Sequence, residues 1–588
     1  MLLTTLRKLI EEVTGEKNFS LDEPEVKGLP AGRQGRGDFS TNVAFALARK
    51  TRLAEAQRGG KGISPMAAAE ELKNKLSGSK LFEKVEAASP GFVNFYVSKE
   101  ATAKELQEIV KAGNKWGKAK QPKKDTVIVE YSAPNVAKPM HIGHLRSTII
   151  GDALANLYEF LGYKVVRWNY IGDWGTQFGK LTAAYKLWGN KKKLEASPIE
   201  TMLELYVRFH EEAKKDPGLE KIGQEEFKKL EEGNKESKKL WEWFRRESLK
   251  DFSRLYKVLD VKFDITAGES FYEKALKPLI ERLIESGIAR ESEGALIIPL
   301  DKEGLPPALV RKSDGATLYL TRDIANLEYR LSKYKPSKIL YVVANEQALH
   351  FSQLFAVARI MELTSAEVEH IKFGMVLGPD GKKLSTREGK TVILDDLINE
   401  AVKLARKTVQ NKNPKLSSRE KDKVASVVGV GAIKYNDLSQ NRIGDITFNW
   451  EKMLSITGNS APYLQYTYVR LKSVLRKGKV VKPAFAKALP AGRQVQQGRH
   501  LSDADRRVIT KLAQFPEVIR RSAEEYLPNH LANYLYALAQ EINHYYETNP
   551  ILKSEAKVKT VRLNLINAVA VTLKNGLNLL GIKTLERM

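Results

Sequence analysis

Two histidines three positions apart, His141 and His144, are the residues whose types and spacing most directly indicate chemistry in this chain. A run of mostly β-branched residues, 126–132, and a proline-containing loop precede them, and a helical pattern begins near Gly143. The free backbone N–H groups of a helix start favour a bound anion, and two imidazoles there could donate hydrogen bonds to a phosphoryl group. Gly143, between the histidines, would let a nucleotide approach the backbone closely.

The same pair of histidines admits two other interpretations. A metal site would need a third and a fourth ligand, and no acidic cluster of the His-Glu-x-x-His kind lies beside the pair. Two polar residues at a strand–helix junction would need no ligand at all. We favour the phosphate site, because the helix start and the intervening glycine both suit an anion.

A second group of candidate residues lies in "GPDGKKLSTREGKTV", residues 378–392, where glycine, serine and threonine separate several cations. Taken alone, such a segment is a solvated basic loop. Together with the histidine pair, it would form a cationic loop able to neutralise a leaving pyrophosphate. The cations are Lys382, Lys383, Arg387 and Lys390.

Composition limits the classes of function. The chain has 588 residues and a formal net charge of +26, which favours a polyanionic partner, although a basic and well-solvated surface would have the same charge. There is no cysteine, so disulfides, thiolate zinc sites and a cysteine nucleophile are excluded. No stretch reaches the roughly 18 consecutive apolar residues that span a bilayer, and we expect a soluble, cytoplasmic protein.

The elements that must position these residues indicate a multidomain α/β protein. Residues 1–110 are expected to form an α+β module, and residues 401–588 a bundle of helices. Residues 120–400 alternate strand and helix signals, which is typical of a doubly wound parallel sheet, with an inserted subdomain at about 190–310. The expected helices include 2–14, 41–54 and 65–76, and the expected strands include 91–98, 126–132, 339–344 and 374–378.

The two groups of residues resemble the HIGH and KMSKS signatures of class I aminoacyl-tRNA synthetases. The flanking segments narrow the resemblance to the arginyl-tRNA synthetases, and it covers essentially the whole chain. The segments that carry it are "SAPNVAKPMHIGHLRST", "NYIGDWGTQFGKL", "DGATLYLTRDIA", "NSAPYLQYTYVR", "GDFSTNVAFALAR", "PGFVNF" and "GLNLLGIKTLERM".

Three features depart from the family pattern. The second signature reads "KLSTR", so that Arg387 stands where the family usually has its last lysine, and Lys382 is an additional upstream cation. Leu585 replaces the proline that commonly precedes the terminal "ERM". The hexapeptide "LPAGRQ" at 29–34 and 489–494 is foreign to the pattern, and we interpret both copies as tolerated loop insertions.

The resemblance implies a Rossmann-like catalytic domain that ligates L-arginine to the 3′ end of tRNA(Arg). Arginine would attack the α-phosphate of ATP to form arginyl-adenylate and pyrophosphate, and transfer to the tRNA ribose would release AMP. Mg²⁺ is expected to arrive with ATP, and no structural zinc is expected. The implied catalytic residues are His141, His144, Lys382 and Lys383, and the implied ATP-binding residues are His141, Gly143, His144, Lys383, Ser385, Thr386 and Arg387.

The resemblance also assigns an arginine pocket. A planar guanidinium needs a carboxylate that accepts two hydrogen bonds, and by resemblance this is Asp323, with Tyr319 one helical turn earlier. Glu130 and Asn135 are implied to hold the α-amino end of the substrate, and Gln347 is implied as a further contact. From the residues alone, Asp323 would be an ordinary acid near a helix start and Gln347 a surface polar residue.

The terminal domains are implied to bind tRNA. The N-terminal module resembles the part of the family that binds the tRNA elbow, and the C-terminal helices resemble the anticodon-binding bundle. Aromatic side chains near cations suit single-stranded loops, although tyrosines on a helix also pack in cores. The expected tRNA-binding residues are Asn42, Tyr463, Tyr466, Tyr468 and Arg470. A small-molecule nucleotidyltransferase and a non-catalytic RNA-binding paralogue remain as alternatives, and a monomer is expected.

Overall fold

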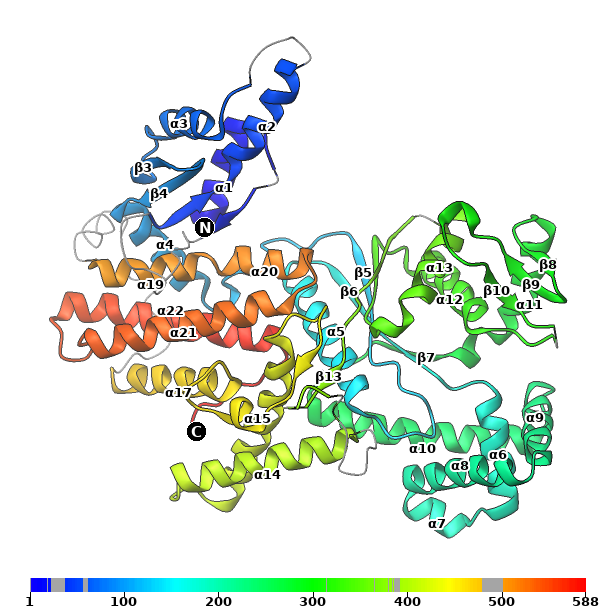
Figure 1. Cartoon of the computed structure of the whole chain (residues 1–588). Helices are drawn as coiled ribbons and strands as arrows, with labels where there is room; N and C mark the ends of the chain where they lie inside the picture. Colours follow the sequence, from blue (N-terminus) through cyan, green and yellow to red (C-terminus); the bar gives the residue numbers. More distant parts are fainter. Residues whose placement is uncertain are drawn as a thin grey trace.

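The computed structural model describes most of the chain as one assembly of three parts (Figure 1). Several predicted residues, namely Lys383, Ser385, Thr386 and Arg387, lie outside the described residues, as do both "LPAGRQ" copies. The described residues are 2–17, 19–22, 37–56, 62–313, 315–363, 365–378, 380–382, 384, 392–478 and 501–588.

A parallel sheet of five strands forms the centre of the molecule, and its order is β12-β11-β5-β6-β7. The chain runs from β5 to β6 and β7 on one side and later returns to β11 on the other side of β5. The prediction of a doubly wound sheet is therefore confirmed, and the direction of winding reverses between β5 and β11. The strands are β5 (Thr126–Glu130), β6 (Lys164–Ile171), β7 (Ile265–Gly268), β11 (Lys338–Tyr341) and β12 (Glu367–His370).

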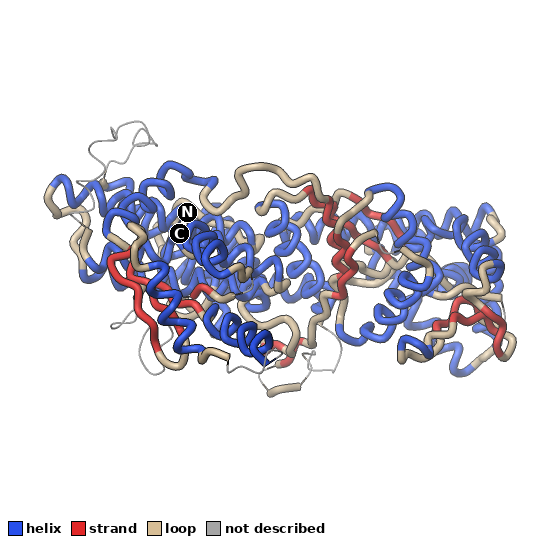
Figure 2. Tube along the Cα trace, turned by 90° about the horizontal axis from the view of Figure 1, so that it is seen from above, coloured by secondary structure: helices blue, strands red, loops and turns tan. Residues whose placement is uncertain are grey.

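Helices cover both faces of this sheet, which appears in Figure 2 as a narrow layer of strands between helices. Side chains alternate along β5: Val127 and Val129 join the hydrophobic core that contains α5, whereas Ile128 joins the core formed with α11, α12 and α13. Because both faces are covered, all five residues of β5 are buried. The helices are α5 (Ile142–Phe160), α11 (Glu273–Glu285), α12 (Tyr319–Tyr334) and α13 (Ala348–Ile360).

The prediction of one insertion over about 190–310 is wrong in one respect, because β7 divides that region and belongs to the main sheet. A group of helices precedes β7, and a small antiparallel sheet follows α11. Only the first two residues of "ITAG" in β7 favour strands, and alanine and glycine do not, so its pairing with β6 depends on tertiary context. The inserted elements are α6 (Thr176–Trp188), α7 (Lys191–Ala196), α8 (Pro198–Lys215), α9 (Gly218–Glu231), α10 (Lys235–Leu259), β8 (Arg290–Ser292), β9 (Ala295–Ile298) and β10 (Ala308–Arg311).

The C-terminal part is built of helices, as predicted, and Figure 1 shows them stacked beside the sheet. The predicted strand 374–378 exists as β13 (Val376–Leu377), but it lies outside the main sheet and pairs in parallel with β14 (Ile446–Thr447). The segment before the second signature is thereby joined to the helical part. The helices are α14 (Leu394–Lys412), α15 (Ser418–Leu438), α16 (Trp450–Leu454), α17 (Ala461–Lys477), α19 (Asp503–Ala513), α20 (Phe515–Glu524), α21 (Pro528–Thr548) and α22 (Ala556–Leu579).

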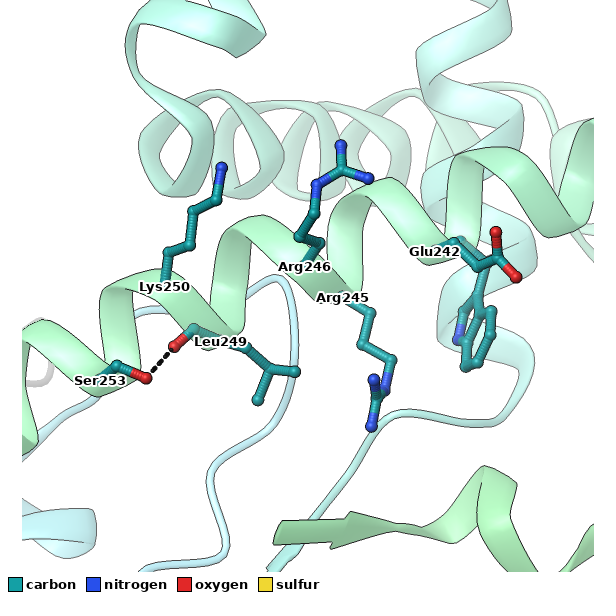
Figure 3. Close-up of a pocket in the computed structure, with 7 residues that line it drawn as sticks. Glu242, Arg245, Arg246, Leu249, Lys250 and Ser253 are labelled. Carbon is teal, nitrogen blue, oxygen red and sulfur yellow. Dashed lines mark hydrogen bonds between the residues drawn. The ribbon is translucent and has the colours of Figure 1, made fainter. Parts of the chain in front are cut away.

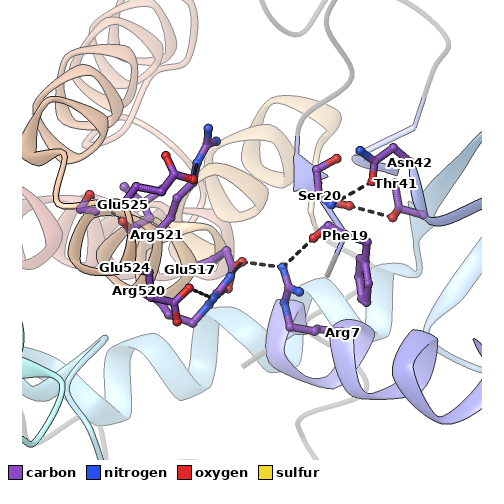
Figure 4. Close-up of polar contacts among 12 residues, drawn as sticks. Arg7, Phe19, Ser20, Thr41, Asn42, Glu517, Arg520, Arg521, Glu524 and Glu525 are labelled. Atoms are coloured by element: carbon purple, nitrogen blue, oxygen red, sulfur yellow. Dashed lines mark hydrogen bonds and ion pairs between the residues drawn. The ribbon is translucent and has the colours of Figure 1, made fainter. Parts of the chain in front are cut away.

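The N-terminal module is a four-stranded antiparallel sheet of order β1-β2-β4-β3 with four helices, and it lies against α19 and α20 (Figure 1). The contact with α20 is largely ionic: Arg7 Nη2 lies 2.6 Å from Glu517 Oε1, and Arg520 binds the same carboxylate (Figure 4). The elements are α1 (Leu2–Thr14), β1 (Leu21–Asp22), β2 (Phe39–Thr41), α2 (Val43–Ala56), α3 (Pro65–Leu76), β3 (Phe82–Ala88), β4 (Phe92–Val97) and α4 (Lys99–Ala112).

A buried ion pair joins α5 to the C-terminal helices. Arg146 Nε lies 2.9 Å from Asp437 Oδ2 of α15, and Arg146 Nη1 donates to the carbonyl of Gly374 at 2.6 Å. The two side chains are only 1% and 6% exposed. An uncompensated charge at such a site is costly, so α5, the segment before β13 and α15 are held in one arrangement.

We expect Asp437→Ala to lower the free energy of unfolding by about 3–5 kcal/mol, because it leaves the buried Arg146 guanidinium without its counter-charge. Denaturant unfolding followed by circular dichroism would measure this. Asp422→Ala on the same helix removes an exposed acid that pairs with Arg406 and should cost less than about 1 kcal/mol. Equal losses in the two variants would contradict the special role of the buried pair.

Candidate active site

The two predicted histidines cap the start of α5. His141 precedes the helix, and its Nδ1 accepts the backbone N–H of Gly143 at 3.1 Å, whereas His144 Nδ1 accepts the N–H of His141 at 3.1 Å. This reciprocal arrangement is a capping box built from imidazoles. Because each Nδ1 acts as an acceptor, the proton of each neutral ring belongs on Nε2, which can donate to an anion.

The His144 ring is neutral under ordinary conditions. Burial, together with the neighbouring His141, lowers its pKa to about 3. The two ring centroids are 3.9 Å apart, so two positive charges at this place would repel each other. The pair can therefore offer hydrogen bonds without presenting two imidazolium ions.

The position of the His141 ring explains why residue 143 is a glycine. A Cβ at this position would lie 3.0 Å from Cε1 and 3.2 Å from Nδ1 of His141. A side chain here would therefore push the imidazole away from the helix start that it caps. Glycine at this position therefore keeps the His141 ring in place over the helix start.

The segment that follows the second signature is anchored on the first signature. The N–H of Ile142 donates to the carbonyl of Val392 at 3.2 Å, and the N–H of Leu394 donates to the carbonyl of Met140 at 2.9 Å. His141 and Ile393 form an isolated antiparallel bridge between these bonds. Residues 392–394, which follow the second signature, therefore lie directly beside the histidines.

The other end of the second signature is held by β13. The N–H of Leu384 donates to the carbonyl of Val376 at 2.8 Å, and the N–H of Gly378 donates to the carbonyl of Lys382 at 2.7 Å. The side chain of Lys382 is exposed, and its backbone belongs to this turn. Of the predicted loop cations, Lys382 is the one whose position the structure describes.

The loop between β5 and α5 contains three non-glycine residues with left-handed backbone: φ is +76° at Ser132, +46° at Ala133 and +64° at Ala137. Such conformations cost free energy and persist where neighbouring groups enforce them. Each of the three backbone N–H groups is bound by a side chain from another element. The bonds run from Ser132 to Ser147 Oγ at 2.8 Å, from Ala133 to Asn169 Oδ1 at 3.2 Å and from Ala137 to Ser248 Oγ at 2.9 Å.

Glu130, at the carboxyl end of β5, is engaged by a buried arginine. Its Oε2 pairs with Nη2 of Arg330, whose guanidinium also lies 4.4 Å from the ring centroid of Trp168. Both members of the pair are buried. Sequence reasoning did not anticipate Arg330, which lies 200 positions away in the chain.

Asn135 lies at the same edge of the sheet and is exposed. It forms an isolated parallel bridge with Gly172, and its Oδ1 lies 2.2 Å from the place where a Cβ of Gly172 would stand. The glycine in "YIGDWG" therefore makes room for the Asn135 side chain. This contact brings the segment before the first signature together with the end of β6.

Asp323 of α12 forms a hydrogen bond with His350 of α13, with 2.6 Å between Oδ2 and Nε2. Burial opposes protonation of His350, but the hydrogen bond and charge of Asp323 raise the pKa of the imidazole above its ordinary value. Gln347 is exposed immediately before α13, and Tyr319 is 62% exposed at the first position of α12. The carboxylate of Asp323 is partly buried and already has one partner.

Glu269 is a second carboxyl group in this region, and sequence reasoning missed it. It follows β7 in the short 3-10 helix η2 (Glu269–Tyr272), and it is only 9% exposed. Burial is the main cause that raises its pKa to about 8; the charge of Arg322 opposes this shift, and the charge of Asp323 adds to it. Among the described residues, no hydrogen bond or ion pair involves its carboxyl group. An acid directly after a parallel strand was the available signal, but β7 itself went unrecognised.

Comparison with known proteins agrees with this geometry. Residues 105–450 match the family model "tRNA synthetases class I (R), catalytic domain". The model "Arginyl tRNA synthetase N terminal domain" matches residues 2–97, and the model "DALR anticodon binding domain" matches residues 464–588. The chain belongs to the arginyl-tRNA synthetase family.

Individual members of the arginyl-tRNA synthetase family are similar over nearly the whole chain. An arginine–tRNA ligase of Halothermothrix orenii is 44% identical over 528 residues, which cover 89% of this chain and 91% of the relative. One of Enterococcus faecalis is 43% identical, with coverage of 93% and 92%. The Thermus thermophilus arginyl-tRNA synthetase structure has a TM-score of 0.82 at 25% identity and covers 100% of both chains. The family resemblance of the sequence is thereby confirmed.

The residues predicted to bind tRNA differ in how accessible they are. Tyr466 is 48% exposed, Tyr463 accepts a hydrogen bond from Asn543 at 2.9 Å, and the Arg470 guanidinium lies over the ring of Tyr546. The position of Tyr468 contradicts the prediction that this residue binds tRNA. Its side chain is 2% exposed and its hydroxyl donates to Glu586, so its ring packs in the core and cannot serve as a stacking surface in this conformation.

Asn42 of the N-terminal module has a local role that the structure shows directly. Its Oδ1 accepts the backbone N–H of Ser20 at 2.9 Å, beside the bond from the Thr41 hydroxyl to the carbonyl of Ser20 (Figure 4). Asn42 is only partly exposed. Its amide therefore holds two segments of the module together.

Two general properties complete the description of the site. Within the described ranges, no three histidine, aspartate or glutamate side chains are grouped so that they could hold a metal ion. A search of the same ranges finds no helix that is both long and apolar enough to cross a membrane.

The partly buried His144 makes stability depend on pH. Its pKa is about 3 in the folded protein and about 6.5 when unfolded, so the unfolded chain binds an additional proton between these values. The contribution of the neutral ring is complete above pH 6.5 and falls as the pH falls. Between pH 7.5 and pH 5, the parent should lose about 2 kcal/mol more unfolding free energy than His144→Asn.

Denaturant unfolding at the two pH values would measure this difference. The matched control is His544→Asn, which changes an exposed histidine and should keep the pH dependence of the parent. An identical pH dependence in the parent and in His144→Asn would contradict a neutral His144 in the folded protein.

Proposed function

We propose that this chain ligates L-arginine to the 3′ end of tRNA(Arg) through an arginyl-adenylate, with release of AMP and pyrophosphate. The observation that carries the proposal is the meeting of anion-binding and cation-binding groups at the carboxyl edge of one parallel sheet. The capped start of α5 suits a phosphate, and the carboxyl groups of Asp323 and Glu269 suit a guanidinium. The arginine–tRNA ligases among its relatives support the same reaction.

The histidine pair would act on ATP, which enters as its magnesium complex. The Nε2–H groups of His141 and His144 would donate to oxygens of the α-phosphate as charge shifts toward the leaving group. Lys382, with Lys383, Ser385, Thr386 and Arg387 of the same loop, would bind the departing pyrophosphate. The anchoring of Val392 and Leu394 beside the histidines supports this placement.

The two chemical steps need positioned groups more than a nucleophilic side chain. A carboxylate oxygen of arginine attacks the α-phosphorus, and the bond from that phosphorus to the pyrophosphate oxygen breaks. In the second step, the 2′-hydroxyl of the tRNA ribose attacks the activated carbonyl, loses its proton, and AMP leaves. Holding the reactants in line supplies much of the acceleration in such reactions.

The guanidinium pocket would use two carboxyl groups. Among the described residues the buried carboxyl group of Glu269 has no hydrogen bond or ion pair, and a bound guanidinium would supply both. Asp323 would face the same cation, with Tyr319 beside it and with His350 holding Oδ2. Since Arg330 binds only Oε2 of Glu130, the α-amino group of the substrate would contact Oε1.

The polar residues at the sheet edge would hold the other end of arginine. Asn135 and Gln347 are both exposed there and would bind the α-amino and carboxylate groups. The terminal domains would hold the tRNA, with Asn42 in the N-terminal module at the elbow and Tyr463, Tyr466 and Arg470 near the anticodon. Domain limits of 1–110, 120–400 and 401–588, a cytoplasmic location and a monomeric state belong to this proposal.

The first test compares charging of tRNA(Arg) with each amino acid, together with amino-acid-dependent exchange of pyrophosphate into ATP. We expect arginine alone to support both reactions, with tRNA required for exchange. A small-molecule nucleotidyltransferase would show exchange without dependence on arginine or tRNA. A non-catalytic RNA-binding protein would bind tRNA and show neither reaction. Either result would overturn the proposal.

Asp323→Asn should lower kcat/KM for arginine by roughly 10²–10⁴, because an unpaired buried charge costs about 3–5 kcal/mol. Glu269→Gln should have an effect of the same direction, whereas the affinities for ATP and tRNA should change little. Asp301→Asn changes an exposed acid of the same domain and serves as the control. Normal charging of arginine by Asp323→Asn would show that the specificity carboxylate lies elsewhere.

A further inference from the structure

The loop that carries Asn135 has a centre bound to the sheet and a left-handed turn on each side. At the centre, the N–H of Gly172 donates to the carbonyl of Pro134 at 3.1 Å, and Asn135 forms its bridge with Gly172 at the end of β6. Before the centre φ is +46° at Ala133, and after it φ is +64° at Ala137. The position of Asn135 therefore depends on how both turns are held.

Helix α10 contacts both of these turns. Ser248 Oγ accepts the N–H of Ala137 at 2.9 Å, and the hydroxyl oxygen of Tyr256 lies 2.7 Å from Ser132 Oγ. Ser248, Phe252 and Tyr256 follow one another at intervals of four residues, and all three are buried. One buried stripe of the helix thus reaches the loop on both sides of Asn135.

The Ser248 hydroxyl is oriented to accept a hydrogen bond from the loop. The side chain is 0% exposed, and the hydroxyl donates to the carbonyl of Phe244 in its own helix at 2.9 Å. Its proton is therefore used, and its oxygen remains for the N–H of Ala137. Left-handed backbone is unfavourable for alanine because its Cβ approaches a carbonyl oxygen, so this turn needs a bond that holds it. Among the described residues, only Ser248 bonds to that N–H.

The Tyr256 hydroxyl holds the other turn by two routes. It contacts Ser132 directly, and it also accepts a hydrogen bond from Asn169 Nδ2 at 3.1 Å. Asn169 Oδ1 in turn accepts the N–H of Ala133 at 3.2 Å. Removal of this one hydroxyl would loosen both contacts.

We propose that α10, an element inserted into the sheet domain, holds Asn135 in position for arginine, with Ser248 and Tyr256 as positioning residues. Neither side chain touches the substrate. They act by fixing the two turns between which Asn135 lies, so that its amide faces the pocket in one orientation. The inference rests on the proposed function, in which Asn135 binds one end of the substrate arginine.

The test measures pyrophosphate exchange by full-length Ser248→Ala and Tyr256→Phe with tRNA(Arg) present. Each substitution removes one hydroxyl, and we expect kcat/KM for arginine to fall about three- to tenfold through a higher KM, as for the loss of one hydrogen bond. The values of kcat and of KM for ATP should stay those of the parent, because the histidine rings are held by their own caps.

The matched control is Ser253→Ala on the same helix. Its hydroxyl is exposed and donates to the carbonyl of Leu249 at 2.7 Å within α10 (Figure 3). This variant loses a serine hydroxyl without touching the loop, and it should keep the parent KM for arginine.

A combination with Asn135→Ala separates positioning from a general loss of structure. If the hydroxyls act through Asn135, Ser248→Ala and Tyr256→Phe should have no further effect on kcat/KM for arginine in the Asn135→Ala background, whereas independent effects would multiply. Tyr256→Phe keeps the packed ring, so it decides the question if Ser248→Ala fails to fold.

An unchanged KM for arginine in a folded α10 variant, or losses of the same size with and without Asn135, would overturn the inference. If the parent protein exchanges pyrophosphate in response to arginine while the α10 variants behave like it, the positioning role is refuted and the proposed function stands. A parent protein that does not respond to arginine would instead overturn the proposed function.

Discussion

The rest of the structure depends on the burial of helix α5 along nearly its whole length. Its first turn presents the histidine pair, its next turn carries Arg146 into the contact with Asp437, and Ser147 and Thr148 hold the strained loop that follows β5. Polar groups buried in this way must all find partners, because an orphaned group costs free energy comparable to a lost hydrogen bond or more. The partners come from the sheet, from the loop and from the C-terminal helices. Because the buried polar groups of α5 need partners, the sheet, the loop after β5 and the C-terminal helices are held in one arrangement around it.

Polar groups that lack a partner among the described residues are candidates for binding a ligand. His144 is partly buried and neutral with a proton on Nε2, and Glu269 is buried with no hydrogen bond or ion pair to its carboxyl group among the described residues. Glu130, in contrast, has its charge balanced by Arg330 and belongs as much to the core as to the pocket. Polar groups with partners hold the scaffold, and we propose that those without partners bind the phosphate and the guanidinium. The loop with three left-handed residues lies between these two kinds of group, where backbone strain commonly accompanies function.

Charge also joins the parts that a long nucleic acid would have to bridge. The N-terminal module contacts α20 through Arg7, Glu517 and Arg520, so its attachment is ionic as well as apolar. The buried pair of Arg146 and Asp437 likewise joins α5 to α15. The proposed tRNA substrate, which would contact the terminal domains and the active site at once, is a long polyanion. The net charge of +26 is consistent with such a ligand.

The sequence by itself determined the family, the doubly wound domain, most of the helices and the segments that contain the two signatures. These features depend on local patterns: β-branched runs for buried strands, periodic apolar residues for helices, and glycine beside histidine at a helix start. Tertiary structure alone decided the place of β7 in the sheet, the pairing of β13 with β14, the burial of Tyr468 and the partners of Glu130 and Asp323. The physical reason is that a residue's partner can lie hundreds of positions away, as Arg330 does from Glu130. Local periodicity predicts which residues are buried, whereas only the folded chain shows which polar groups pair with one another in the interior.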